Sequence, residues 1–109
     1  MAKKALLIDY EYCTGCQACQ VACKQEHDYA VGQGGIHLNQ IDVTLPNGRL
    51  RTDFLPFLTA YCDGCAARVA RGEQPACVKH CQAQTMFHGT VDEMAEAMDD
   101  KPHSVMYRL

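Results

Sequence analysis

Apolar and polar residues alternate through the middle of the chain, over residues 36–58. The apolar positions of the first half are Ile36, Leu38, Ile41, Val43 and Leu45. A period of two is typical of a half-buried strand, and the slip at residues 39–40 predicts a bulge or bend. Pro46-Asn47-Gly48 is a strong turn signal, and residues 49–58 resume the extended pattern. The sequence therefore predicts a hairpin, and Pro56 indicates that its second strand ends there or lies on an edge.

Shorter patterns predict elements on both sides of this hairpin. Residues 4–9, KALLID, form an apolar run that predicts a strand, and residues 18–25 predict a short helix. Thr90 with Glu93 three residues later matches a capping box, which predicts the start of a helix in the tail. The last residues, SVMYRL, predict a strand that pairs with or lies near residues 4–9.

The chain is short and mildly acidic. Its 109 residues predict one small domain with a limited core. The formal net charge of −3 does not favour nucleic acid as a partner. No stretch has the length of a transmembrane helix or the pattern of a signal peptide, so no direct membrane insertion is expected. The expected location is the cytoplasm, or the periplasm if a partner subunit carries the export signal.

Eight cysteines in two groups carry the candidate chemistry. The first group, C-x₂-C-x₂-C-x₃-C, contains Cys13, Cys16, Cys19 and Cys23, and the second, C-x₂-C-x₁₁-C-x₃-C, contains Cys62, Cys65, Cys77 and Cys81. The first is the bacterial ferredoxin pattern, in which the fourth cysteine binds the other cluster. By this logic the sequence predicts two [4Fe–4S] clusters. Cluster 1 is held by Cys13, Cys16, Cys19 and Cys81, and cluster 2 by Cys23, Cys62, Cys65 and Cys77.

Two other uses of eight cysteines remain open. Two Cys₄ zinc sites also need eight thiolates, although zinc sites typically use separated C-x₂-C pairs rather than a compact run of four. A disulfide framework needs an oxidising compartment, which the missing signal peptide argues against.

The stretch CTGCQACQVACKQEH, followed by FLPFLTAYCDGCAARVARGEQPACVKHC, resembles the iron–sulfur subunits of the dimethyl sulfoxide reductase family of molybdenum and tungsten oxidoreductases. The similarity extends over nearly all of residues 5–90. It implies an electron-transfer subunit whose partner is a large catalytic subunit with a molybdopterin-type cofactor. A further redox subunit or carrier is a second candidate partner. Two features depart from the family pattern. Gln82-Ala83-Gln84 follow Cys81 where a proline is usual, and the chain has two cysteine groups where four are common.

The predicted fold class is therefore α+β: a ferredoxin-like two-cluster core with pseudo-twofold symmetry, a β-hairpin insert and a C-terminal helix plus strand. The single domain covers residues 1–109, with cluster motifs at 13–23 and 62–81, an insert at 24–61 and an extension at 82–109. We predict one-electron relay and assign no catalytic residue. A freely diffusing ferredoxin and a zinc-binding interaction module are the alternatives.

Basic and histidine side chains also occur in and around the two motifs. Lys24, Arg68, Arg71 and Lys79 lie near the ligands in the sequence and either offset cluster charge or form a solvated basic face. His27, His37, His88 and His103 show no metal-ligand spacing and are treated as ordinary polar residues.

Overall fold

β1, Lys4–Asp9, is the central strand of a three-stranded antiparallel sheet in the computed structural model, which describes residues 3–109. Its neighbours are β4, Met86–Thr90, and β5, Ser104–Arg108. The pairing of β5 with β1 confirms the predicted contact between the two ends of the chain. β4 was not predicted, because its five residues MFHGT carry no clear alternation. The central position of β1 explains its unbroken apolar run, since Ala5 to Ile8 are all buried.

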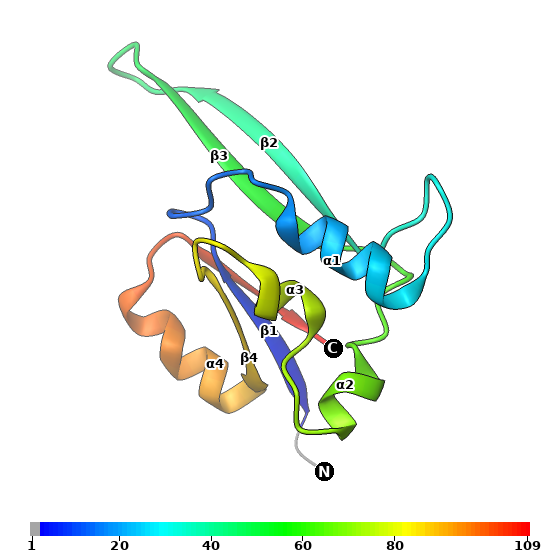
Figure 1. Cartoon of the computed structure of the whole chain (residues 1–109). Helices are drawn as coiled ribbons and strands as arrows, with labels where there is room; N and C mark the ends of the chain where they lie inside the picture. The colour runs from blue at the N-terminus through cyan, green and yellow to red at the C-terminus, as the bar shows by residue number, and fades with distance from the viewer. Residues whose placement is uncertain (1–2) are drawn as a thin grey trace.

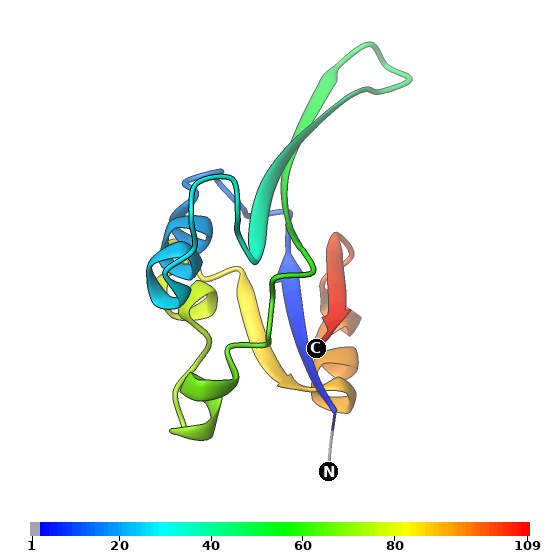
Figure 2. The same ribbon diagram turned by 90° about the vertical axis from the view of Figure 1, so that its right-hand side faces the viewer.

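The predicted hairpin is present as β2, Ile36–Thr44, and β3, Leu50–Leu58. The two strands pair in one continuous register from Ile36 opposite Leu58 to Thr44 opposite Leu50, so the predicted bulge is wrong. Pro56 lies inside β3 and is tolerated because each strand of a two-stranded ribbon has a free edge. The hairpin projects well beyond the rest of the molecule, as Figures 1 and 2 show.

Helices cover both faces of the three-stranded sheet (Figure 2). The helices α1, Ala18–His27, and α3, Ala76–His80, pack side by side on one face, with the short α2, Ala66–Ala70, below them. On the other face lies α4, Val91–Ala97, followed by the 3₁₀ turn η1, Met98–Asp100. Thr90 and Glu93 form the predicted capping box at the start of α4.

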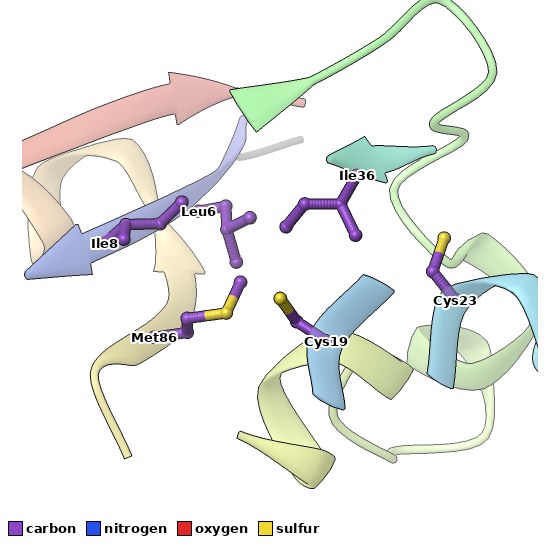
Figure 3. Close-up of a cluster of buried hydrophobic side chains, with 6 residues drawn as sticks. All are labelled: Leu6, Ile8, Cys19, Cys23, Ile36 and Met86. Carbon is purple, nitrogen blue, oxygen red and sulfur yellow. The ribbon is translucent and has the colours of Figure 1, made fainter. Parts of the chain in front are cut away.

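A small core joins the sheet to α1 and the base of the hairpin (Figure 3). Its buried residues are Leu6, Ile8, Cys19, Cys23, Ile36 and Met86. Two of these are cysteines on α1, and Figure 3 shows the Cys19 side chain pointing from the helix toward Leu6 and Met86. The structure is thus a small mixed α/β domain with two sheets, in which the candidate ligands are part of the core.

Candidate metal centres

α1 carries two cysteines four positions apart, Cys19 and Cys23, and Cys77 of α3 is followed four positions later by Cys81, directly after the last residue of that helix. Residues four apart lie one above the other on one face of a helix. Cys19 and Cys81 line one cavity, and Cys23 and Cys77 line another. Along α1 the cysteine of the first cavity comes before that of the second, whereas along α3 and the residue after it this order is reversed. Two neighbouring helices that run in opposite senses bring one cysteine from each helix to each end of the pair.

The first cavity, site A, is lined by Cys13, Cys16, Cys19 and Cys81. The loop before α1 supplies the first two sulfurs, and the turn after α3 supplies the last. Gly15 in that loop has a φ of +77°, and an added Cβ there would meet Cδ1 of Phe54 in β3 at 2.8 Å. The loop therefore needs glycine both for its backbone conformation and for its close approach to the hairpin.

The second cavity, site B, is lined by Cys23, Cys62, Cys65 and Cys77. About 400 Å³ of space lies between its lining atoms, part of it open to solvent. Gly35, just before β2, lies so close that an added Cβ would meet the Cys23 sulfur at 3.0 Å. Cys65 itself has a left-handed backbone with φ of 53°, held by a 2.8 Å hydrogen bond from its N–H to Asp63 Oδ1.

The base of the hairpin forms a wall of both sites. Ile36 is paired with Leu58, and both side chains line site B. Two positions further along, Leu38 is paired with Pro56, and both line site A. Side chains two positions apart project from the same face of a strand, so a single face of the hairpin serves both sites. The segment predicted as an insert is thus part of the candidate centres.

In site A, the Cys81 sulfur has several hydrogen-bonding contacts with the residues that follow it. The N–H of Thr85 and the Thr85 hydroxyl both lie 3.5 Å from its sulfur. Burial raises the pKa of Cys81, but these contacts, with those from the N–H groups of Ala83 and Gln84, outweigh it and lower the pKa overall. The Cys19 thiolate is stabilised by one backbone hydrogen bond, from the N–H of Gln20. Burial has the larger effect and raises the pKa of Cys19 to about 11. Site A therefore holds a thiol whose pKa lies below its ordinary value.

In site B, burial is the largest influence on the pKa values of three of the cysteines. It raises the pKa of Cys77 to about 12, and the neighbouring cysteines raise that pKa further. Burial also raises the pKa of Cys23 and of Cys65, and backbone N–H groups offset part of each shift. Cys19 of site A is among the residues that raise the pKa of Cys77. The two sites are thus close enough for their charges to interact.

All eight cysteines are free thiols in the structure. Within residues 3–109, no three His, Cys, Asp or Glu side chains converge closely enough to hold a single metal ion. Four sulfurs around a cavity are the donor set that a [4Fe–4S] cluster uses. The residues present at each site therefore fit such a group.

The two arginines near the ligands are paired with acids. Arg68 lies 3.5 Å from Glu26 and 3.6 Å from Glu73, and Arg71 lies 3.1 Å from Glu73. Arg68 also donates a 2.9 Å hydrogen bond to the carbonyl of Gln74. These contacts tie the loop after α2 to α1. For the two arginines, they favour a structural role over an unpaired basic face.

One residue that lines a site was not predicted from the sequence. His27, the last residue of α1, lines site B, and its Nε2 lies 3.2 Å from the Cys65 sulfur. The available signal was its position four residues after Cys23, which puts both side chains on the same face of the helix. His80, which directly precedes the predicted ligand Cys81, is exposed.

Comparison with known proteins also points to iron–sulfur binding. Residues 4–25 match the family model of a 4Fe-4S binding domain. The probable anaerobic dimethyl sulfoxide reductase chain YnfG of Escherichia coli K12 is 26% identical over 91 residues, covering 84% of this chain and 34% of that protein. The B subunit of tetrathionate reductase from Salmonella typhimurium is 33% identical over 84 residues, covering 76% and 30%. The beta subunit of formate dehydrogenase 2 from Nitratidesulfovibrio vulgaris is 47% identical over 47 residues, covering 40% and 21%.

These matches confirm the resemblance predicted from the cysteine motifs, and they support an iron–sulfur, electron-transfer chemistry for the chain. The chain spans about a third of the length of the curated relatives it matches. In the part of the chain that the structure describes, no helix is both long and apolar enough to cross a membrane.

Proposed function

We propose that the chain relays single electrons through two [4Fe–4S] clusters, because it resembles the iron–sulfur subunits of the dimethyl sulfoxide reductase family. The electrons pass to or from a large catalytic subunit with a molybdopterin-type cofactor that contains molybdenum or tungsten. One cluster is held by Cys13, Cys16, Cys19 and Cys81 of site A. The other is held by Cys23, Cys62, Cys65 and Cys77 of site B.

The observation that carries the proposal is the lining of the two cavities. Each contains four cysteine sulfurs, and each combines three from one motif with one from the other. Such crosswise use of the motifs holds two redox groups close together, as transfer between them requires. It also links the motif at residues 13–23 to the motif at residues 62–81 through metal bonds, which stabilises a domain with a small core.

The proposed domain is a single ferredoxin-type unit over residues 1–109. Its two motifs lie at 13–23 and 62–81, with the hairpin segment 24–61 between them and the extension 82–109 after them. The pairing of α1 with α3, and the spacing of four positions between two cysteines on α1 and between Cys77 of α3 and Cys81 just after it, support a ferredoxin-like core with pseudo-twofold symmetry.

The hairpin favours an electron-transfer subunit over a freely diffusing ferredoxin. It projects from the body and exposes apolar side chains, with Val43 at 47% and Leu50 at 66% of their full accessible surface. A carrier that meets its partners only briefly has no need of such an arm, whereas a subunit in a lasting complex can bury it. We assign no catalytic residue to this chain, and the substrate chemistry belongs to the partner.

Metal analysis of the anaerobically purified chain tests the cluster assignment. We expect about eight iron and eight acid-labile sulfide per chain, with a brown colour and two reduced-cluster signals by electron paramagnetic resonance (EPR). Four irons or fewer per chain would contradict two clusters, and zinc in place of iron would support the interaction module.

Co-purification from the native host tests the partner. We expect the chain to elute with a large molybdenum- or tungsten-containing subunit. Elution as a monomer with both clusters, and with no large companion, would instead support the freely diffusing ferredoxin.

A further inference from the structure

His27 reaches site B from the end of α1. Its Nε2 lies 3.2 Å from the Cys65 sulfur, although 38 positions separate the two residues in the sequence. The side chain is only 20% exposed. It faces the cavity together with Cys23, which precedes it by one turn of the same helix. The imidazole is thus built into the wall of the site.

The orientation of the His27 ring is fixed by its neighbours. The ring stacks on Tyr29, with centroids 5.4 Å apart and an interplanar angle of 29°. The Tyr29 hydroxyl donates a 2.6 Å hydrogen bond to the carbonyl of Tyr61, just before Cys62. The stack therefore ties the end of α1 to the loop that carries two of the site B cysteines, and it aims Nε2 at Cys65.

The position of the proton follows from what Nε2 faces. When Cys65 is a metal ligand its sulfur is a thiolate, and Oδ1 of Asp63 lies 3.7 Å from the same nitrogen. Both groups accept hydrogen bonds. A lone pair on Nε2 would be repelled by both of them, whereas an N–H is attracted by both. The geometry therefore favours the tautomer in which Nε2 carries the hydrogen.

We propose that His27 donates a hydrogen bond from Nε2 to the Cys65 thiolate and thereby raises the reduction potential of the site B cluster. This inference rests on the proposed function. One-electron reduction adds negative charge, which the cluster shares with its thiolate ligands. A donor to a ligand sulfur stabilises the reduced form more than the oxidised form, and hydrogen bonds to the sulfurs are among the factors that set cluster potentials.

The test is an EPR-monitored redox titration of the purified chain. His27→Phe keeps an aromatic ring beside Tyr29 and removes the donor. We expect one midpoint potential to fall by about 59 mV, a tenfold change in the one-electron equilibrium, while the other stays unchanged. His27→Gln restores a donor and should recover part of the shift. His103→Phe is the control for the substitution itself, because His103 lies beside Tyr10 and Glu11 instead of a cysteine, and it should move neither potential.

Unchanged potentials in His27→Phe, with full iron content, would overturn the inference and leave the proposed function intact. A wild-type chain without two clusters would instead contradict the proposed function. Should His27→Phe lose its site B cluster, wild-type protein labelled with ¹⁵N-histidine decides the matter. We expect pulsed EPR to detect a ¹⁵N coupling to one reduced cluster, which disappears in His27→Gln. Absence of that coupling in the wild type would overturn the inference.

Discussion

Site A and site B share a four-cysteine set and the same pair of helices, yet their environments differ. In site A, Cys16 is exposed, and Cys81 receives hydrogen bonds that lower its pKa. In site B, Cys23 and Cys65 are buried, and burial raises the pKa of Cys77 to about 12. Site A thus contains an exposed cysteine and a cysteine whose pKa is lowered by hydrogen bonds, whereas burial raises the pKa of three cysteines of site B.

The difference comes from segments outside the cysteine motifs. The turn over residues 82–85, which has Gln84 in the left-handed region, directs its N–H groups at Cys81. Site B is instead closed by apolar residues from distant parts of the chain, including Leu6 of β1, Ile36 of β2 and the C-terminal Leu109. Two sets of identical donors therefore differ in electrostatics because different elements fold over them. Each of the following predictions tests that contrast.

The largest expected effect is the loss of a whole cluster on removal of one ligand. Cys81→Ser should remove the site A cluster and Cys77→Ser the site B cluster, each halving the iron content, because a cubane needs its four donors. EPR spectra identify which signal is lost. Cys13→Ser should remove the same signal as Cys81→Ser. Loss of the other signal in Cys13→Ser would contradict the crosswise partition.

Gly15→Ala should weaken site A while leaving site B intact. The added methyl would be placed at a φ of +77° and 2.8 Å from Phe54, so both backbone strain and a clash oppose it. Gly48→Ala at the hairpin tip is the matched control, because its φ is +83° and no atom lies within 4 Å. We expect about 1–2 kcal/mol of destabilisation from strain alone in the control. In Gly15→Ala we expect a loss larger by about 1–3 kcal/mol.

Thermal unfolding of the cluster-loaded protein and its iron content measure both Gly15→Ala and Gly48→Ala. Equal effects in the two variants would show that the contact between the site A loop and the hairpin does not constrain the loop.

Thiol reactivity should separate the two sites in the cluster-free chain. At pH 8, iodoacetamide should modify Cys81 at least tenfold faster than Cys77, because the thiolate is the nucleophile. The pKa of Cys81 lies below the ordinary 9.0 and that of Cys77 is about 12. Mass spectrometry of timed samples gives the rates, and denatured chain is the control, in which the two rates should converge.

The raised pKa of Cys77 also affects the stability of the folded chain. Between pH 9.0 and about 12 the unfolded chain loses the Cys77 proton before the folded chain does, so the folded cluster-free chain becomes less stable as the pH rises through this window. Stability that does not change across it, or equal alkylation rates in the folded chain, would show that Cys77 is no more shielded from solvent than Cys81.

The smallest expected effect is at Thr85. Thr85→Val removes the hydroxyl 3.5 Å from the Cys81 sulfur and should lower the site A potential by less than a tenfold change in the equilibrium. Thr85→Ser retains the hydroxyl and should stay close to the wild type. The same redox titration measures both. A shift in the site B potential would contradict the assignment of Cys81 to site A.

The fold could be predicted in part, and the successes have local causes. The run at residues 4–9, the alternation at 36–58 and the Thr90–Glu93 pair each specify an element through short-range geometry, and the structure contains all three. The bulge near residue 39 was wrong, because a slip in the apolar pattern of an exposed strand need not interrupt its hydrogen bonding. β4 was missed because its place beside β1 depends on a partner more than 75 positions away in the sequence.

The sequence by itself determined the chemistry of this protein, because the identity and spacing of its cysteines limit what the loops and short helices can bind. The crosswise partition was also predicted from the motif. The two cavities are lined by the same two sets of four cysteines, and the binding of a cluster by each set stays a prediction. Only the tertiary structure decided that one face of the hairpin forms a wall of both sites and that His27 lies beside Cys65. These contacts join residues far apart in the sequence, and their geometry depends on how β2, β3, α1 and α3 pack together.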